Sequence, residues 1–172
     1  RVLSDIKRVY PGYKQKDGYE LAGFAWLQGW NDMVASGTYP NRGQPGGYDA
    51  YTDCLAHFIR DVRKDLNAPK MKFVIGVMGV GGPLEKYASP RYVPIHGAFR
   101  EAMAAPVSMP EFKGNVFAVR TANFWDMRLK ELEDNQERVK QMAGFLKNKH
   151  KDHSNRDGSM TAQEQKEYIE KY

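Results

Sequence analysis

The sequence predicts an α/β fold, with helices on both faces of a short parallel sheet. Three apolar runs support this prediction: residues 21–27, 73–78 and 116–119. None of them alternates between apolar and polar side chains, and turn residues bound each one, which is typical of strands buried on both faces. Helical patterns separate the runs, and this alternation favours parallel strands in a three-layer αβα arrangement.

The first strand lies between a helical segment and a long loop. Residues 2–9 carry apolar side chains at helical spacing, which predicts a helix before the strand at 21–27. The strand stops at the polar residues 28–32. Residues 36–47 are rich in Gly, Pro and Asn, and their length and polarity indicate a surface loop beside a site.

Two further strand and helix steps follow along the chain. An apolar stripe at helical spacing predicts a helix over residues 48–66, before the second strand at 73–78. The glycine-rich residues 79–83 close that strand. A further helix is expected over residues 94–104, before the third strand at 116–119.

Residues 127–172 show helical patterns and no further strand pattern. A long charged helix is predicted over residues 127–149, and a last helix begins at Thr161, with Glu164 three residues later in a capping box. We therefore expect an α/β domain over residues 1–126 and a helical extension over 127–172.

Composition restricts the classes of function. The 172 residues are 41% hydrophobic and 27% charged, which suits a folded domain of ordinary size. The net charge is +5, but basic residues are scattered and mostly paired with acidic ones, so nucleic-acid binding is not expected. No stretch approaches the roughly 18 consecutive apolar residues of a membrane span, and no signal peptide is visible.

The chain has one cysteine, Cys54. A disulfide within the chain and a thiolate zinc cluster are therefore excluded. Cys54 falls in the helical pattern of residues 48–66, where we expect a small buried core residue.

Residues 28–32 form the strongest candidate site because they directly follow a buried strand. Ligands of open parallel sheets bind in the crevice at the carboxyl ends of the strands. Gly29 allows a tight turn and a close backbone approach, and the amide of Asn31 could donate to an oxyanion. A polar turn after a strand would also explain this motif, and both interpretations stay open on the residues alone.

The same region resembles a known family. Residues 20–33, with Gly29, Asn31 and Asp32, resemble the third conserved block, Gly-x-Asn-Asp, of the Ser-Gly-Asn-His (SGNH) hydrolases. Trp26, Gln28 and Gly29 resemble its sialate O-acetylesterase and acetylxylan esterase branch. The stretches that resemble the following helix and strands of this branch are 58–66, 72–79 and 113–121.

The resemblance implies roles for single residues. Asn31 would be one of three oxyanion donors, Gly29 would shape the turn, and Gln28 would line the pocket beside Asp32. Trp30 stands where this branch more often has Glu, and it becomes a substrate-pocket candidate. Gly79, at the end of the second strand, borders the same crevice and is a further candidate.

The resemblance also implies a function. It implies a flavodoxin-like sheet, and hydrolysis of O-acetyl esters on carbohydrate through an acyl-serine, without a metal or an organic cofactor. Extracellular or periplasmic export is expected from the family's substrates. The alternative is a non-catalytic carbohydrate-binding or scaffold domain of the same fold. Which sugar is used, and the oligomeric state, do not follow from the sequence.

The family's nucleophile and base have no counterpart in these residues. The nucleophile belongs to a Gly-x-Ser block near the N-terminus, and the base is a His near the C-terminus. None of the chain's serines or histidines has such a setting: Ser4, Ser36, Ser89, Ser108, Ser154, Ser159, His57, His96, His150 and His153. We therefore expect this chain to be a segment that is inactive alone, with both groups outside it.

Two other motifs are weaker. Residues 153–164 resemble an EF-hand loop, with Asn155, Asp157 and Glu164 at ligand positions, but His153 occupies the first position and a helix connector is the expected role. The glycines of residues 76–82 have neither phosphate-loop nor dinucleotide spacing, so no nucleotide site is expected.

Overall fold

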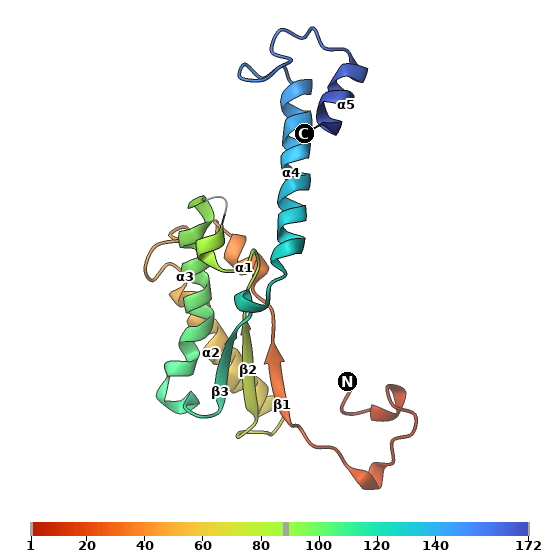
Figure 1. Cartoon of the computed structure of the whole chain (residues 1–172). Coiled ribbons are helices and arrows are strands. Elements are labelled where there is room, and N and C mark those ends of the chain that lie inside the picture. Colours follow the sequence, from red (N-terminus) through yellow and green to blue (C-terminus); the bar gives the residue numbers. More distant parts are fainter. Residues whose placement is uncertain (1, 88–89, 172) are drawn as a thin grey trace. The chain divides into compact units, whose positions relative to one another are not determined.

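The computed structural model describes residues 2–87 and 90–171. The chain divides into two compact units, Arg1–Asn123 and Phe124–Tyr172, and each is described by itself (Figure 1). The first is a mixed α/β unit around a three-stranded parallel sheet, and the second is helical. This confirms the α/β class with a parallel sheet and helices.

The α/β unit alternates strands and helices as the sequence predicts. Its strands and α-helices are β1 (Gly23–Trp26), α1 (Trp30–Val34), α2 (Asp49–Asp65), β2 (Lys72–Val77), α3 (Val93–Ala104) and β3 (Val116–Arg120). The short 3₁₀ helices before the last strand are Ile6–Arg8, Gln15–Asp17, Leu84–Lys86, Pro90–Tyr92, Ala105–Ser108 and Pro110–Phe112, and Thr121–Phe124 follows it.

The sheet has the order β1-β2-β3, with both pairs parallel. Helix α2 connects β1 to β2, helix α3 connects β2 to β3, and Figure 1 shows both helices on the same face of the sheet. The three strands therefore end at the same edge, where the loops after β1, β2 and β3 emerge. This edge is where the sequence places the candidate site.

The core lies between the sheet and these two helices. Phe24 stacks on Phe73 of the neighbouring strand, with ring centroids 5.0 Å apart, and Phe58 of α2 meets Phe24 edge-on at 5.8 Å. Phe24 and Phe58 are partly buried, and the buried residues around them include Tyr51, Leu55, Ile59, Phe73, Ile75, Val77, Phe99, Met103 and Val116. Each fully buried apolar side chain contributes about 1.5–3 kcal/mol, so this layer stabilises the unit.

The opposite face of the sheet is open within this unit. Val74 is 36% exposed, and its register partner Phe117 is 44% exposed. The side chain of Leu27 lies over Gly76, where an added Cβ would meet Leu27 Cδ2 at 2.1 Å. The prediction that the strands are buried on both faces is therefore wrong for the described part of this unit, because its two long helices pack on one face only.

Local differences concern the N-terminal segment, the turn after β1 and the cysteine. Residues 2–9 form only the 3₁₀ turn Ile6–Arg8, and the polar turn after β1 continues into α1. Cys54 is exposed, contrary to the expected core role. Cys54 lies outside the buried stripe of α2, which includes Tyr51, Leu55, Ile59 and Arg63.

The second unit is a pair of helices, α4 (Met127–Lys147) and α5 (Ala162–Glu170). Asp126 accepts hydrogen bonds from two backbone amides at the start of α4. The capping box of Thr161 and Glu164 at the start of α5 is confirmed. None of the described helices is both long enough and apolar enough to cross a membrane.

Candidate functional site

Gly29 places the turn after β1 in direct contact with the core. It is buried and precedes α1, and its carbonyl accepts the hydrogen bond from the amide of Met33. A Cβ at this position would lie 2.9 Å from two ring atoms of Phe99 and 3.4 Å from Met78 Cε. Phe99 is fully buried, so Gly29 allows this turn to pack closely on the core.

Hydrogen bonds hold the polar residues of this turn. Gln28 Nε2 donates to Asp32 Oδ2 at 3.2 Å, and the Tyr39 hydroxyl donates to Asp32 Oδ1 at 3.4 Å. The Tyr51 hydroxyl donates to the carbonyl of Gln28 at 3.2 Å. Burial, together with the nearby Asp32 carboxylate, raises the pKa of Tyr39 to about 12, so Tyr39 stays a donor at neutral pH.

Two further contacts hold the end of α1. The Tyr48 hydroxyl donates to the carbonyl of Met33 at 2.6 Å, and Arg42 Nη1 donates to the carbonyl of Val34 at 2.6 Å. Both donors come from residues 36–48, so the polar loop packs back on α1. Side-chain hydrogen bonds therefore hold both the turn before α1 and the end of α1.

Asn31 differs from its neighbours in this turn. Its side chain is exposed and makes no hydrogen bond with any part of the chain that the structure describes. The next residue toward the strand, Trp30, is 51% exposed. The structure thus presents one free amide donor and one indole to solvent at the end of β1.

Gly79 has a different role from the one expected. It is buried, and a Cβ there would lie 2.4 Å from the backbone nitrogen of Ala122 and 2.5 Å from the carbonyl carbon of Thr121. Thr121 Oγ1 also donates to the carbonyl of Val77 at 2.8 Å. Gly79 therefore lets the ends of β2 and β3 approach each other, and it does not line the cleft that opens beside them.

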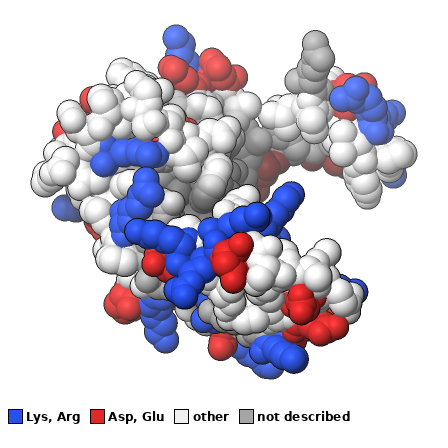
Figure 2. Space-filling view, turned by 90° about the horizontal axis from the view of Figure 1, so that it is seen from above, with Lys and Arg blue, Asp and Glu red and all other residues white. Residues whose placement is uncertain are grey.

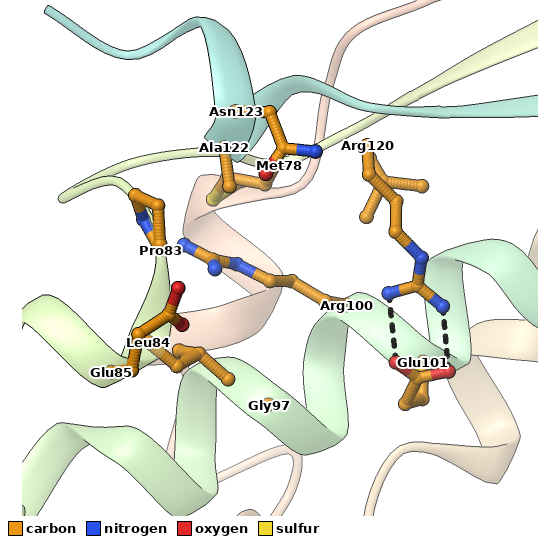
Figure 3. Close-up of a pocket in the computed structure, with 11 residues that line it drawn as sticks. Met78, Pro83, Leu84, Glu85, Gly97, Arg100, Glu101, Arg120, Ala122 and Asn123 are labelled. Carbon is orange, nitrogen blue, oxygen red and sulfur yellow. Dashed lines mark hydrogen bonds and ion pairs between the residues drawn. The ribbon is translucent and has the colours of Figure 1, made fainter.

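That cleft, of about 180 Å³, opens at the ends of β2 and β3 (Figure 3). Its lining residues are Val77, Met78, Pro83, Leu84, Glu85, Gly97, Arg100, Glu101, Arg120, Ala122 and Asn123. None of the site residues that the sequence indicates is among them. Met78 connects the two places, because it lines the cleft and also lies against Gly29.

Arg100 organises the loop that forms one wall of this cleft. Its Nη2 donates to the carbonyls of Val80 and Gly82 and to the Tyr87 hydroxyl, each at 3.0 Å. Tyr87 in turn contacts His96 Nδ1 at 2.7 Å. Burial and then the charge of Arg100 lower the pKa of His96, so its imidazole is neutral at pH 7.

An ion pair forms the other polar wall. Arg120 Nη1 and Nη2 donate to the two carboxylate oxygens of Glu101, at 2.8 and 3.0 Å. The hydrogen bond from Arg120 is the main cause of the lowered pKa of Glu101. Both side chains are more than half exposed, so we expect the pair to contribute little to stability.

This cleft is not among the sites that the sequence predicts. Arg100 is only 6% exposed although it lies in the middle of α3. A charged residue beside Phe99 and Met103 in an apolar helix is the signal that could have indicated it. Periodicity alone treats such a residue as part of a solvated face.

The histidines of the chain lie in several different elements. His57 is exposed on α2, and Ser89 lies outside the described residues. In the parts of the chain that are described, no group of three His, Cys, Asp or Glu side chains could hold a metal ion.

The loop that resembles an EF-hand serves as a connector between α4 and α5. Asn155 is buried, and it donates to the carbonyl of Leu146 at 2.9 Å and accepts from the amide of Met160 at 2.8 Å. Glu164 is engaged with Thr161 in the capping box. The expected ligand positions are therefore used within the loop itself.

Charge on the surface is mixed. Figure 2 shows Lys and Arg side chains with Asp and Glu side chains close to them on the face that it draws.

Comparison with known proteins does not assign this chain to a family. No family model, no curated protein and no solved structure matches it.

Proposed function

We propose that the turn after β1 is the oxyanion-binding part of a carbohydrate O-acetylesterase with the flavodoxin-like fold of SGNH hydrolases. The observation that supports this most is the free amide of Asn31, at the carboxyl end of a parallel strand. The bonds of Gln28 and Asp32 fix the backbone around it. With the backbone held, only the side chain of Asn31 has to be oriented when negative charge develops on the oxygen.

The chemistry would proceed through an acyl-serine. A serine attacks the acetyl carbonyl, and the oxygen of the tetrahedral intermediate accepts a hydrogen bond from Asn31 Nδ2. A histidine takes the proton of the serine and returns it to the sugar oxygen as the C–O bond breaks. Water then hydrolyses the acetyl-enzyme. By the resemblance, the serine and the histidine belong to sequence blocks that residues 1–172 do not contain.

A second candidate is a carbohydrate-binding domain without catalysis. It is favoured by the exposed indole of Trp30, 51% accessible beside Asn31. A half-exposed aromatic ring with a polar neighbour suits stacking on a sugar ring. This candidate needs no serine or histidine block.

The test is hydrolysis of p-nitrophenyl acetate and of acetylated xylan by the product of the whole reading frame that contains this chain. We expect hydrolysis of both, and Asn31→Ala should lower kcat by about 10²–10³-fold, the usual loss of one oxyanion donor. Asn148→Ala, an exposed Asn of the helical unit, is the matched control and should keep full activity. Residues 1–172 alone should be inactive.

Two results would overturn the esterase proposal. One is an inert reading-frame product that still binds xylan, which would favour the binding domain. The other is an active enzyme in which Asn31→Ala and Asn148→Ala have the same kcat. In that case hydrolysis would not use this turn.

A further inference from the structure

The cleft at the ends of β2 and β3 contains a buried cation with unused hydrogen-bonding capacity. Arg100 is 6% exposed, and all three of its hydrogen bonds come from Nη2. Its Nε is buried and has no acceptor among the described residues. Arg100 Nη1 also makes no hydrogen bond with any described residue, so the guanidinium can still donate to an acceptor in the cleft.

A carboxylate lies on the other side of the same space. In Figure 3 the side chain of Glu85 is directed toward the guanidinium of Arg100, yet the two form no ion pair within the described residues. Glu85 is exposed and comes from the loop after β2, whereas Arg100 comes from α3. The cleft thus presents a donor and an acceptor that face each other without satisfying each other.

The charges of the other walls restrict the ligand. Glu101 is neutralised by Arg120, which leaves Arg100 and Glu85 as the two opposed charges of the cleft. An anion would meet the Glu85 carboxylate, and a cation would meet the Arg100 guanidinium. A neutral hydroxyl group can accept from one and donate to the other.

We propose that this cleft binds a neutral, polyhydroxylated ring, with one hydroxyl oxygen accepting from Arg100 and a neighbouring hydroxyl donating to Glu85. The amide of Asn123 adds a further polar group, and Leu84, Met78 and Ala122 form an apolar wall for the C–H face of a pyranose. The proposal rests on the proposed function, because it assigns the cleft to the sugar part of the ester. Met78 joins the cleft to the turn of Asn31 through its contact with Gly29.

Binding can be measured without catalysis, by NMR titration of ¹⁵N-labelled protein of residues 1–172. The probes are three pyranoses of different charge: methyl glucoside (neutral), glucuronate (anionic) and glucosamine (cationic). We expect saturable shifts of cleft amides such as Gly97 and Ala122 with methyl glucoside, and weaker binding of both charged sugars. Glu85→Ala should raise the Kd by about tenfold or more, since it removes a hydrogen bond to a charged group.

The control is Glu133→Gln, an exposed acidic residue of α4, which should bind like the unmodified protein. Absence of saturable shifts with methyl glucoside would overturn the proposal, as would tightest binding of glucuronate or an unchanged Kd in Glu85→Ala. These outcomes are separate from the esterase test. Sugar binding that depends on Glu85, together with no effect of Asn31→Ala on hydrolysis, would refute the oxyanion proposal and leave the sugar subsite standing.

Discussion

Gly79→Ala is the sharpest test of the geometry at the carboxyl end of the sheet. The new Cβ would lie 2.4 Å from the nitrogen of Ala122 and 2.5 Å from the carbonyl carbon of Thr121. Both are backbone atoms at the end of β3, so no side chain can rotate away. The substitution must separate the two strand ends.

The size of the effect follows from two losses. Overpacking in a close-packed region costs about 1–3 kcal/mol. Separation of the ends also removes the hydrogen bond from Thr121 Oγ1 to the carbonyl of Val77 (2.8 Å), a further 0.5–1.5 kcal/mol or so. We therefore expect a destabilisation of about 3 kcal/mol. At roughly 4 °C per kcal/mol for a unit of this size, Tm should fall by about 12 °C.

Thermal unfolding followed by circular dichroism measures this shift. Gly37→Ala is the matched control, because a Cβ at Gly37 would have no atom within 4 Å. Its Tm should stay within a few degrees of the unmodified protein, as for most surface substitutions. Equal Tm values for Gly79→Ala and Gly37→Ala would refute the close approach of the two strand ends.

Three further predictions concern the site and its surroundings. Gly29→Ala should lower the free energy of unfolding by about 1–3 kcal/mol in urea titrations, since the new Cβ would lie 2.9 Å from the buried ring of Phe99; an unchanged midpoint would contradict this contact. Stability should fall as pH rises from 10 to about 12, because unfolded Tyr39 ionises near pH 10 while the folded residue keeps its proton. Urea titrations across this pH range should show that the free energy of unfolding falls less steeply with pH in Tyr39→Phe than in the unmodified protein. The same dependence on pH in both proteins would argue against burial of this hydroxyl. The pKa of His96, measured by NMR titration, should lie below its usual value of 6.5. The contribution of neutral His96 to the free energy of unfolding is then complete above pH 6.5 and is lost as pH falls through the folded pKa. A measured pKa of 6.5 or higher would contradict the burial of His96 near Arg100.

Much of the element order was predictable because the decisive patterns are local. The apolar run of residues 73–78 became β2, and the stripe of residues 48–66 became α2. The capping box of Thr161 and Glu164 follows from a spacing of three residues. Such features depend on neighbours along the chain, which a single sequence shows directly.

The predictions that were wrong concern features that depend on contacts between residues far apart in the sequence. A strand that is apolar on both sides predicts burial on both faces, but Val74 and Phe117 are 36% and 44% exposed in the described structure. Apolar residues alone define the predicted stripe of α2, whereas Arg63 is buried through hydrogen bonds to the carbonyls of Met71 and Asn115. Cys54 does not belong to the buried stripe of α2 and is exposed.

The candidate site also has one part that local sequence patterns predict and one part that they do not. The turn at Gly29 could be predicted from its place after a strand, whereas the cleft could not. The cleft depends on Arg100, which contacts a loop some 20 residues earlier in the chain. No spacing rule relates Arg100 to Glu85 across the space between them.

The turn after β1 shows which of its residues are open to chemical test. Gln28 and Asp32 are joined to each other, and Tyr39 and Tyr51 bind them from outside the turn. Substitution of either residue would therefore change the backbone as well as any contact with a substrate, and lost activity would not identify a role. Asn31 has no such bonds in the described structure, so Asn31→Ala removes one donor and leaves the turn in place. An effect of that variant on kcat, without an effect on Tm, would therefore report on the oxyanion alone.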